Sequence, residues 1–294
     1  MKLKITDVRH HPGDSAFLID DGTTTVLYDT GFAFTGYSVA DNIQKILGER
    51  SLDYIFLTHS HYDHAAGSPY ICARYPNAKV YAGEYAVKIF SKPSARAVMR
   101  DLDHRFAEKC GVLDYEDRID ALKVDFSVKE GDVIAAGSME FTVVELPGHT
   151  KCSVGYYLPS EKLLLGTETL GVYDGGDIVF PSYLVGYQIA LESIAKAEMM
   201  DIENIVLPHY GLLDREKTAF YLSLCRKNAV ETADGILSIL QKGGSYEDAV
   251  RFFREKFYHG NVPAIYPEDA MKLNTEIMVK LLEKELLGGQ RKGE

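Results

Sequence analysis

One short stretch, THSHYDHAAG at residues 58–67, constrains the fold of this chain more than any other feature. It contains three histidines and one aspartate within six positions, directly after the apolar run Tyr54–Leu57. The apolar residues predict a buried strand, which gives way to a loop and then to a helix beginning near His64. The fold must therefore bring a buried strand and a cluster of nitrogen and oxygen donors to one edge of a sheet.

The cluster indicates a metal site. A single histidine is usually a satisfied core or surface residue. His59, His61, Asp63 and His64 cannot all be buried cheaply without a shared partner, whereas a divalent cation satisfies several of them at once. On an extended loop, His59 and His61 point the same way, while Asp63 and His64 face a second position nearby.

Two further histidines occur in a similar setting, where apolar strand residues end beside proline or glycine. His149 lies in ELPGHTKCSVGYY and His209 in IVLPHYG. Such strand-to-loop edges are where α/β folds place their chemistry. Both histidines are therefore candidates for the same site.

Apolar periodicity predicts an α/β body to about residue 212 and a helical region after it. Residues 84–120 are charged and helix-prone, which indicates an insertion, and after His209 the apolar residues follow helical spacing with no further strand. Gly243-Gly244 ends one helix and Ser245 caps the next. The expected strands are 15–19, 24–28, 52–57, 79–82, 122–126, 133–135, 139–145, 153–158, 162–165 and 205–207; the expected helices include 39–47, 191–199, 222–240 and 273–281.

Composition narrows the class of partner. The net charge of −11 argues against a general grip on nucleic acid. No apolar stretch approaches the ~18–20 residues that cross a bilayer, and the four scattered cysteines form no C-x-x-C pair. We expect a cytoplasmic protein with a small-molecule substrate, no nucleic-acid or membrane partner, and reduced cysteines.

Four ordered motifs resemble the metallo-β-lactamase superfamily: D-T-G at 29–31, H-x-H-x-D-H at 59–64, P-G-H-T at 147–150 and P-H at 208–209. The resemblance spans roughly residues 15–212. It implies an αββα metallo-β-lactamase-like sandwich over residues 1–212, with the helical insertion at 84–120. Residues 213–294 then form a helical C-terminal extension that packs over or near the site.

The resemblance also implies a dinuclear centre. His59, His61 and His149 would hold one metal, and Asp63, His64 and His209 the other, with a carboxylate and a hydroxide bridging the pair. Asp63 would also orient the hydroxide, as a catalytic residue. Two divalent metals generate hydroxide near neutral pH and polarise the substrate. Family usage favours zinc or iron, and manganese also suits these ligands.

One position departs from the pattern of the superfamily. Its bridging aspartate usually follows the glycine that ends a strand, but here Gly166 is followed by Thr167 and Glu168. Side chains alternate in a strand, so Glu168 would point away unless the chain bulges or the loop has already begun. We expect Glu168 to reach a metal; the alternative is a weakened second site.

The predicted activity is hydrolysis of an ester bond, either a thioester or a phosphoester. The helical extension resembles the layout of the quinolone-signal response thioesterase, phosphorylcholine esterase and glyoxalase II types. The alternative is a non-catalytic or weakly catalytic ligand-binding regulator; lactonase or lactamase activity is less favoured. Flavodiiron reductases typically carry glutamate at the position of His61, which disfavours electron transfer.

Some choices stay open at this level. The amphipathic C-terminal helices can serve as a lid or as the surface of a homodimer. The basic residues of the insertion, Arg96, Arg100, His104 and Arg105, can hold a substrate anion or form a solvated helix face paired with nearby acids, and we favour the second. Cys152 is expected to pack in the core. The sequence identifies no substrate-binding residues.

Overall fold

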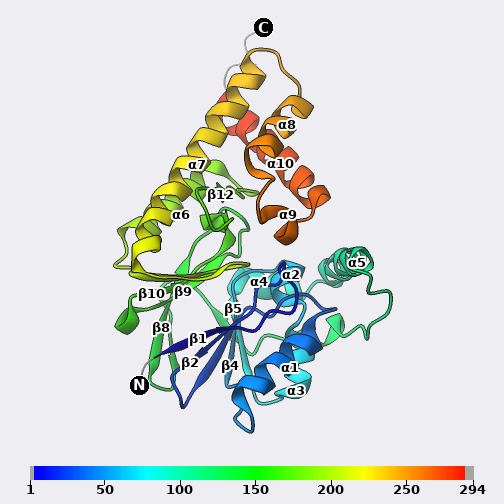
Figure 1. Ribbon diagram of the computed structural model, residues 1–294, viewed down its shortest axis with the longest axis vertical. Helices are drawn as coiled ribbons and strands as arrows, with labels where there is room; N and C mark the ends of the chain where they lie inside the picture. Colours follow the sequence, from blue (N-terminus) through cyan, green and yellow to red (C-terminus); the bar gives the residue numbers. More distant parts are fainter. Residues whose placement is uncertain (1–2, 289–294) are drawn as a thin grey trace. The chain divides into compact units, whose positions relative to one another are not determined.

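The computed structural model describes residues 3–288, which fall into two compact units (Figure 1). The first unit is the chain up to Glu145 together with Cys152–Gly166. The second is Leu146–Lys151 together with the chain from Thr167 onward. The predicted division near residue 212 rests on the sequence and stays a prediction.

The first unit contains a six-stranded sheet in the order β1-β2-β3-β4-β5-β6. The first three strands pair antiparallel, and β3 to β6 run parallel. Because the carboxyl ends of parallel strands meet at one edge, the segments after β3 and β4 become neighbours. The strands are Lys4–Asp7, Phe17–Asp20, Thr25–Tyr28, Tyr54–Leu57, Lys79–Gly83 and Phe126–Val128.

Helices cover one face of this sheet. Figure 1 shows α1 (Gly36–Leu47) beside α3 (Ser68–Arg74), and both contribute to one buried apolar cluster with strands β2 to β5. The apolar positions of α1 recur at helical spacing, so one stripe of the helix is buried. The remaining helices are α2 (Tyr62–Ala65), α4 (Glu84–Phe90), α5 (Pro93–Lys109) and the 3-10 turn η1 (Ile119–Ala121).

A second sheet packs on the other face. Its strands in this unit are ordered β10-β9-β8-β7 and are antiparallel. The Phe56 ring lies 4.6 Å from that of Tyr156 and 5.2 Å from that of Phe141, so aromatic side chains fill the space between the sheets. The strands are Val133–Ala136, Met139–Glu145, Val154–Leu158 and Leu163–Leu165, with the turn η2 at Pro159–Glu161.

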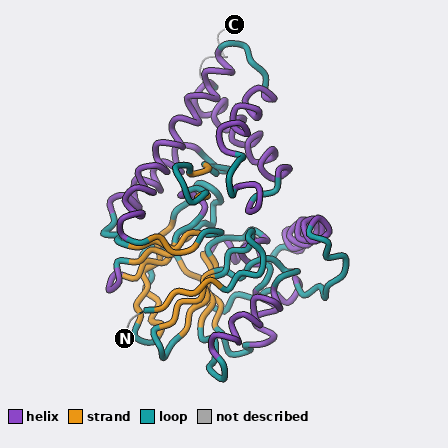
Figure 2. Tube along the Cα trace, viewed as in Figure 1, coloured by secondary structure: helices purple, strands orange, loops and turns teal. Residues whose placement is uncertain are grey.

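The second unit is mostly helical (Figure 2). Asp214 caps α7, and Ser245 with Asp248 forms a capping box that starts α8. Its helices are α6 (Tyr187–Met199), α7 (Arg215–Gln241), α8 (Tyr246–Phe257), α9 (Val262–Ile265) and α10 (Glu268–Leu282), with the π-helical turn η4 at Glu283–Leu287. Short strands form two pairs, β11 (Val172–Tyr173) with β12 (Val179–Phe180) and β13 (Asn204–Leu207) with β14 (Gly211–Leu213).

The mixed α/β fold with a helical C-terminal region is confirmed. Two local predictions were wrong. The strand expected at 122–126 begins only at Phe126, and its predicted start follows η1. A short strand, β14, follows His209 because Gly211–Leu213 pairs back onto β13. The helix expected near His64 is present as α2, which begins at Tyr62. Among residues 3–288, no helix is long and apolar enough to cross a membrane.

Candidate metal centre

The first unit gathers four of the predicted ligands after β4. His59 and His64 are fully buried, while His61 and Asp63 are half-buried. The His59 ring lies 4.6 Å from the His61 ring and 4.0 Å from the His64 ring, and Nε2 of His64 is 3.6 Å from an Asp63 oxygen. The turn of α2 produces this proximity, because the His64 amide donates to the His61 carbonyl at 3.2 Å.

Asp29, directly after β3, orients this group. Its buried carboxylate accepts a hydrogen bond from Nδ1 of His64 at 2.8 Å, from the Thr58 amide at 2.8 Å and from the Ser15 hydroxyl at 2.9 Å. A carboxylate that only accepts fixes the His64 proton on Nδ1, which leaves Nε2 as a metal-ligand atom. The D-T-G motif pointed to this position, but no pattern in the sequence indicated the role of Asp29.

The backbone around Asp29 holds the loop 58–64, which contains His59, His61, Asp63 and His64, in place. Asp29 adopts φ 55°, and the next residue, Thr30, donates through both its amide and its hydroxyl to the His64 carbonyl at 2.7 Å. Gly67 is needed for this approach, since a Cβ there would lie 2.1 Å from the Thr30 carbonyl oxygen. The D-T-G and H-x-H-x-D-H motifs therefore form one interlocked structure at the edge of the sheet.

Tyr156 anchors the strand that leads into the loop. Its hydroxyl donates to the Leu57 carbonyl at 2.8 Å. Burial, followed by the neighbouring Asp29 carboxylate, raises the pKa of Tyr156 well above its usual value. The phenol therefore stays protonated and keeps donating at the last residue of β4.

The second unit gathers the other three predicted ligands. Glu168 is buried, with one carboxylate oxygen 2.8 Å from Nε2 of His149 and the other 3.4 Å from Nε2 of His209. Nδ1 of His149 lies 2.8 Å from the Ser182 hydroxyl and 3.1 Å from its carbonyl oxygen. Because a carbonyl only accepts, this contact favours the tautomer that carries its proton on Nδ1. The unprotonated Nε2, which faces Glu168, can then act as a metal-ligand atom.

The one-residue shift at Glu168 has a simple structural origin. Strand β10 ends at Leu165, Thr167 is extended, and the turn η3 (Glu168–Leu170) begins at Glu168 itself. The loop has thus already begun, and strand alternation no longer decides where the carboxylate points. Thr167 is also buried, and its hydroxyl has no hydrogen-bond partner within residues 3–288.

These two sets of donors suit divalent cations. Each consists of imidazole and carboxylate groups that are wholly or partly buried, and His64 and His149 have their second ring nitrogen held by an acceptor. Nitrogen and oxygen donors of this kind bind zinc, iron and manganese. The assignment of individual ligands stays a prediction.

Other candidates from the sequence have structural roles. Arg96 donates to the carbonyls of Phe90 and Leu122 at 2.7 and 2.9 Å, and Arg100 pairs with Asp117 and Asp120. These guanidinium groups connect α5 to the neighbouring segments of the insertion. Arg105 pairs with Asp101 at 2.9 Å and His104 packs on Tyr115. Cys152 is buried in the apolar core with its thiol 3.4 Å from the Ser60 hydroxyl.

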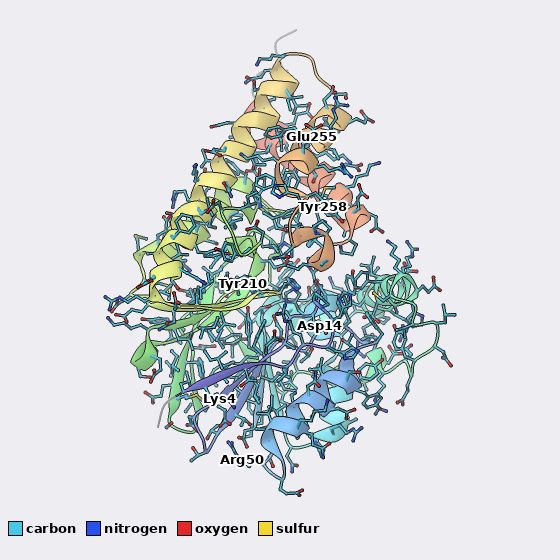
Figure 3. The ribbon with its side chains drawn as sticks, viewed as in Figure 1. Lys4, Asp14, Arg50, Tyr210, Glu255 and Tyr258 are labelled. Carbon is cyan, nitrogen blue, oxygen red and sulfur yellow. The ribbon has the colours of Figure 1, made fainter. Side chains whose placement is uncertain are left out.

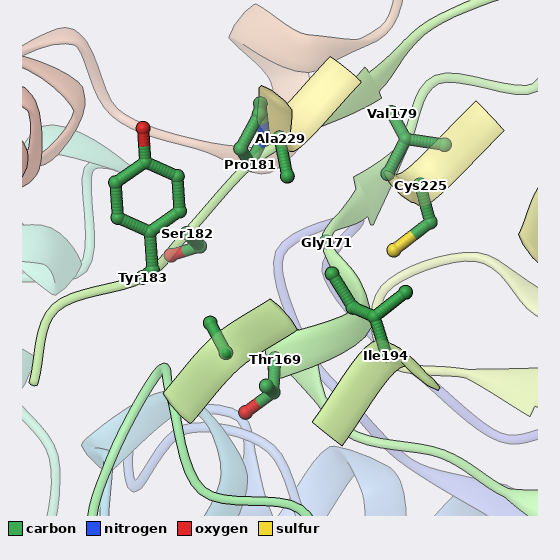
Figure 4. A pocket seen from close by; sticks show the side chains of 10 residues that line it. Thr169, Gly171, Val179, Pro181, Ser182, Tyr183, Ile194, Cys225 and Ala229 are labelled. Atoms are coloured by element: carbon green, nitrogen blue, oxygen red, sulfur yellow. The ribbon is translucent and has the colours of Figure 1, made fainter. Parts of the chain in front are cut away.

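A small cavity lies in the second unit (Figure 4). Two of its lining residues, Thr169 and Ser182, contact His149, so the cavity lies next to the loop 146–151 that contains this histidine. Thr169, Ser182 and Tyr183 line it, together with apolar side chains such as Ile194. Its volume of about 10 Å³ has room for roughly one water molecule. This cavity is therefore not a substrate pocket.

The fold and the donor sets define a metal-binding α/β protein. The family model of the metallo-beta-lactamase superfamily matches residues 13–209, and the chain belongs to this superfamily. Members of the superfamily are mostly metal-dependent hydrolases that use divalent metals.

Individual relatives are more distant. The chain is 30% identical over 139 residues to glyoxylase B2 of Dictyostelium discoideum, covering 47% of this chain and 42% of that protein. It is 24% identical over 276 residues to a nitric oxide reductase of Moorella thermoacetica, covering 94% and 61%. It is 28% identical over 120 residues to a hydroxyacylglutathione hydrolase of Legionella pneumophila, covering 41% and 34%. The chain thus spans less than two thirds of these relatives.

A crystal structure gives the same fold. A metallo-beta-lactamase family protein of Thermus thermophilus matches with a TM-score of 0.64 at 16% identity, covering 98% of this chain and 93% of that one. At this identity the likeness concerns the fold alone.

Proposed function

We propose that the chain is a dinuclear metal-dependent hydrolase of an ester bond. The position of Glu168, with one oxygen toward His149 and the other toward His209, carries the proposal. A carboxylate whose two oxygens face two different imidazoles could serve as the anion that a two-cation site needs. The resemblance to the superfamily supplies the remaining step: His59 and His61 would join His149 on one ion, and Asp63 and His64 would join His209 on the other.

When bound, two divalent cations would lower the pKa of water and polarise the bond to be cleaved. The protein would orient the reacting groups. Asp29 holds the His64 proton on Nδ1, and Ser182 does the same for His149. Asp63 is half-buried beside His64, and in this proposal its carboxylate would orient the attacking water and accept its proton.

A thioester is the preferred substrate class. Hydroxyacylglutathione carries its acyl group on sulfur, and a hydrolase named for that substrate is among the relatives. The similarity to that relative supports the class of bond. It does not identify the acyl or thiol part of the substrate, because it covers only 34% of that protein. Phosphoesters stay the alternative, because the same donors stabilise charge on a phosphoryl oxygen.

Two observations favour competing functions. Thr167 stands where the superfamily usually has its bridging aspartate, which is compatible with a ligand-binding regulator that has lost turnover. The similarity to a nitric oxide reductase points to redox chemistry. Redox chemistry is disfavoured because the chain has His61 at the position where the flavodiiron reductases of this fold typically have glutamate.

The test begins with metal content per chain, measured by elemental analysis on protein purified without chelators. We expect two equivalents, and hydrolysis of one class in a panel of thioesters, phosphodiesters and lactones. Turnover should disappear on chelation and return with the metal found. Two equivalents with tight ligand binding and no turnover would favour the regulator, and turnover that survives complete metal removal would refute the proposal.

A further inference from the structure

The first turn of α6 in the second unit is capped by a residue 98 positions away along the chain. Gly186, the N-cap residue, has no side chain to accept the free amides. Instead, the Glu285 carboxylate in η4 accepts from the Tyr187 amide at 3.1 Å and from the Gln188 amide at 3.2 Å. A carboxylate at this end of a helix satisfies otherwise unpaired amides and complements the helix dipole.

The segment directly before the turn that Glu285 caps holds the loop 146–151, which contains His149. The amides of Leu184 and Val185 donate to the Gly148 carbonyl at 2.9 and 3.0 Å. Ser182, at the start of the same segment, contacts Nδ1 of His149 through its hydroxyl and its carbonyl. The short segment 182–185, just before the capped helix, therefore makes all of these contacts with Gly148 and His149.

Helix α6 itself also contacts the loop. The Ser193 hydroxyl donates to the Pro147 carbonyl at 2.6 Å. A Cβ on Gly148 would come within 2.8 Å of Ala190, so the helix backbone lies directly against the loop. A shift of the first turn of α6 would thus reach the loop directly and through segment 182–185.

We propose that Glu285 is a positioning residue for His149, through which the C-terminal helical region sets the geometry of one metal ligand. The inference rests on the proposed function in one respect, the assignment of His149 as a ligand. Glu285 acts through the first turn of α6 and Ser182 and touches no ligand itself. The C-terminal region would then support the metal centre in addition to any contact with substrate.

The experiment compares metal binding by the full chain and by Glu285→Ala, Glu285→Gln and Ser182→Ala. Glu255→Ala is the matched control, because Glu255 is an exposed carboxylate on α8 of the same helical region (Figure 3). Zinc affinity is measured by competition with a chromophoric chelator. The visible absorption of the cobalt(II)-loaded protein reports the ligand geometry, and thermal unfolding of the metal-free proteins reports stability separately.

Loss of an outer partner of a metal-ligating histidine typically weakens metal affinity by about 10–100-fold. Glu285 acts one step further out, so we expect Glu285→Ala to weaken zinc binding by roughly 10-fold and to change the cobalt spectrum in the same sense as Ser182→Ala. Glu285→Gln keeps an acceptor oxygen but loses the charge that complements the helix dipole, so it should weaken zinc binding measurably but less than Glu285→Ala does. Glu255→Ala should match the unmodified chain.

A Glu285→Ala protein that unfolds more easily but keeps the original zinc affinity and cobalt spectrum would overturn the proposal. If that variant does not fold, Glu285→Gln decides: affinity and spectrum identical to Glu255→Ala, with lowered stability, would overturn it as well. Failure of the proposed function looks different. An unmodified chain that binds metal without turnover, and whose binding weakens on Glu285→Ala, refutes the hydrolase and supports the positioning role.

Discussion

Replacing Asp29 by asparagine is the sharpest test of how the first unit prepares its metal ligands. One carboxylate oxygen accepts from the Thr58 amide at 2.8 Å and the other from Nδ1 of His64 at 2.8 Å. The variant has nearly the same shape, but one of these oxygens becomes an NH₂ group. Both orientations of the new amide place a donor where an acceptor is needed.

The two orientations have different consequences. With its NH₂ toward Thr58, the amide leaves a buried donor facing a donor, which costs about 1–3 kcal/mol of stability. With its NH₂ toward His64, the amide forces Nδ1 to accept, so the proton moves to Nε2, the expected ligand atom. We therefore expect Asp29→Asn to weaken zinc binding by about 10–100-fold, or roughly 1.4–2.7 kcal/mol.

The assay is zinc competition against a chelator, with urea unfolding of the metal-free protein in parallel. Asp114→Asn is the matched control, because Asp114 is an exposed aspartate of the same unit. Asp29→Asn with both affinity and stability like the control would refute the argument, because each orientation of the amide must change one of the two. A loss of stability with unchanged affinity would mean that the amide turns its NH₂ toward Thr58 and that its oxygen still holds the His64 proton on Nδ1.

Three further changes test other parts of the molecule. Glu168→Ala should lower the metal content, measured by elemental analysis, from two equivalents to one or fewer; unchanged stoichiometry and turnover would contradict the bridging role. Burial raises the pKa of Asp103 to about 6 from its ordinary 3.8, so the folded state keeps a proton that the unfolded state has already released. The free energy of unfolding should therefore fall by up to about 3 kcal/mol between pH 4 and pH 7, and urea titrations in which Asp103→Asn shows the same fall would refute this. Cys152→Ala should leave the zinc content unchanged, since the thiol contacts Ser60 in the core; lost zinc would make it a ligand.

The outline of the fold could be predicted because local patterns dominate it. Alternation defined β8 (Met139–Glu145) to the residue, and helical spacing with the Ser245 cap defined the C-terminal helices. Strand β6 was misplaced because Leu122 is apolar and buried but directly follows η1 as its C-cap, so its burial follows no strand period. Apolar periodicity indicates burial, and it identifies a strand only where the backbone also pairs.

Candidate ligands can be identified from the sequence, whereas the groups that orient them cannot. Imidazole and carboxylate clusters are rare outside metal sites, so His59 and His64 stand out. Their partners are common residues at long separations: Asp29 is 35 positions from His64, and Ser182 is 33 positions from His149. Ser182 also acts through its backbone carbonyl, which every residue possesses. No sequence pattern can mark such a contact, because the fold alone creates it.

The Thr167-Glu168 departure combines two changes from the pattern of the superfamily. Here the carboxylate is both displaced by one residue and longer by one methylene, and η3 begins where strand alternation would have turned it away. Its two oxygens end 2.8 Å from Nε2 of His149 and 3.4 Å from Nε2 of His209. A rule about strand register applies only while the strand lasts, so the one-residue shift does not turn the Glu168 carboxylate away from His149 and His209.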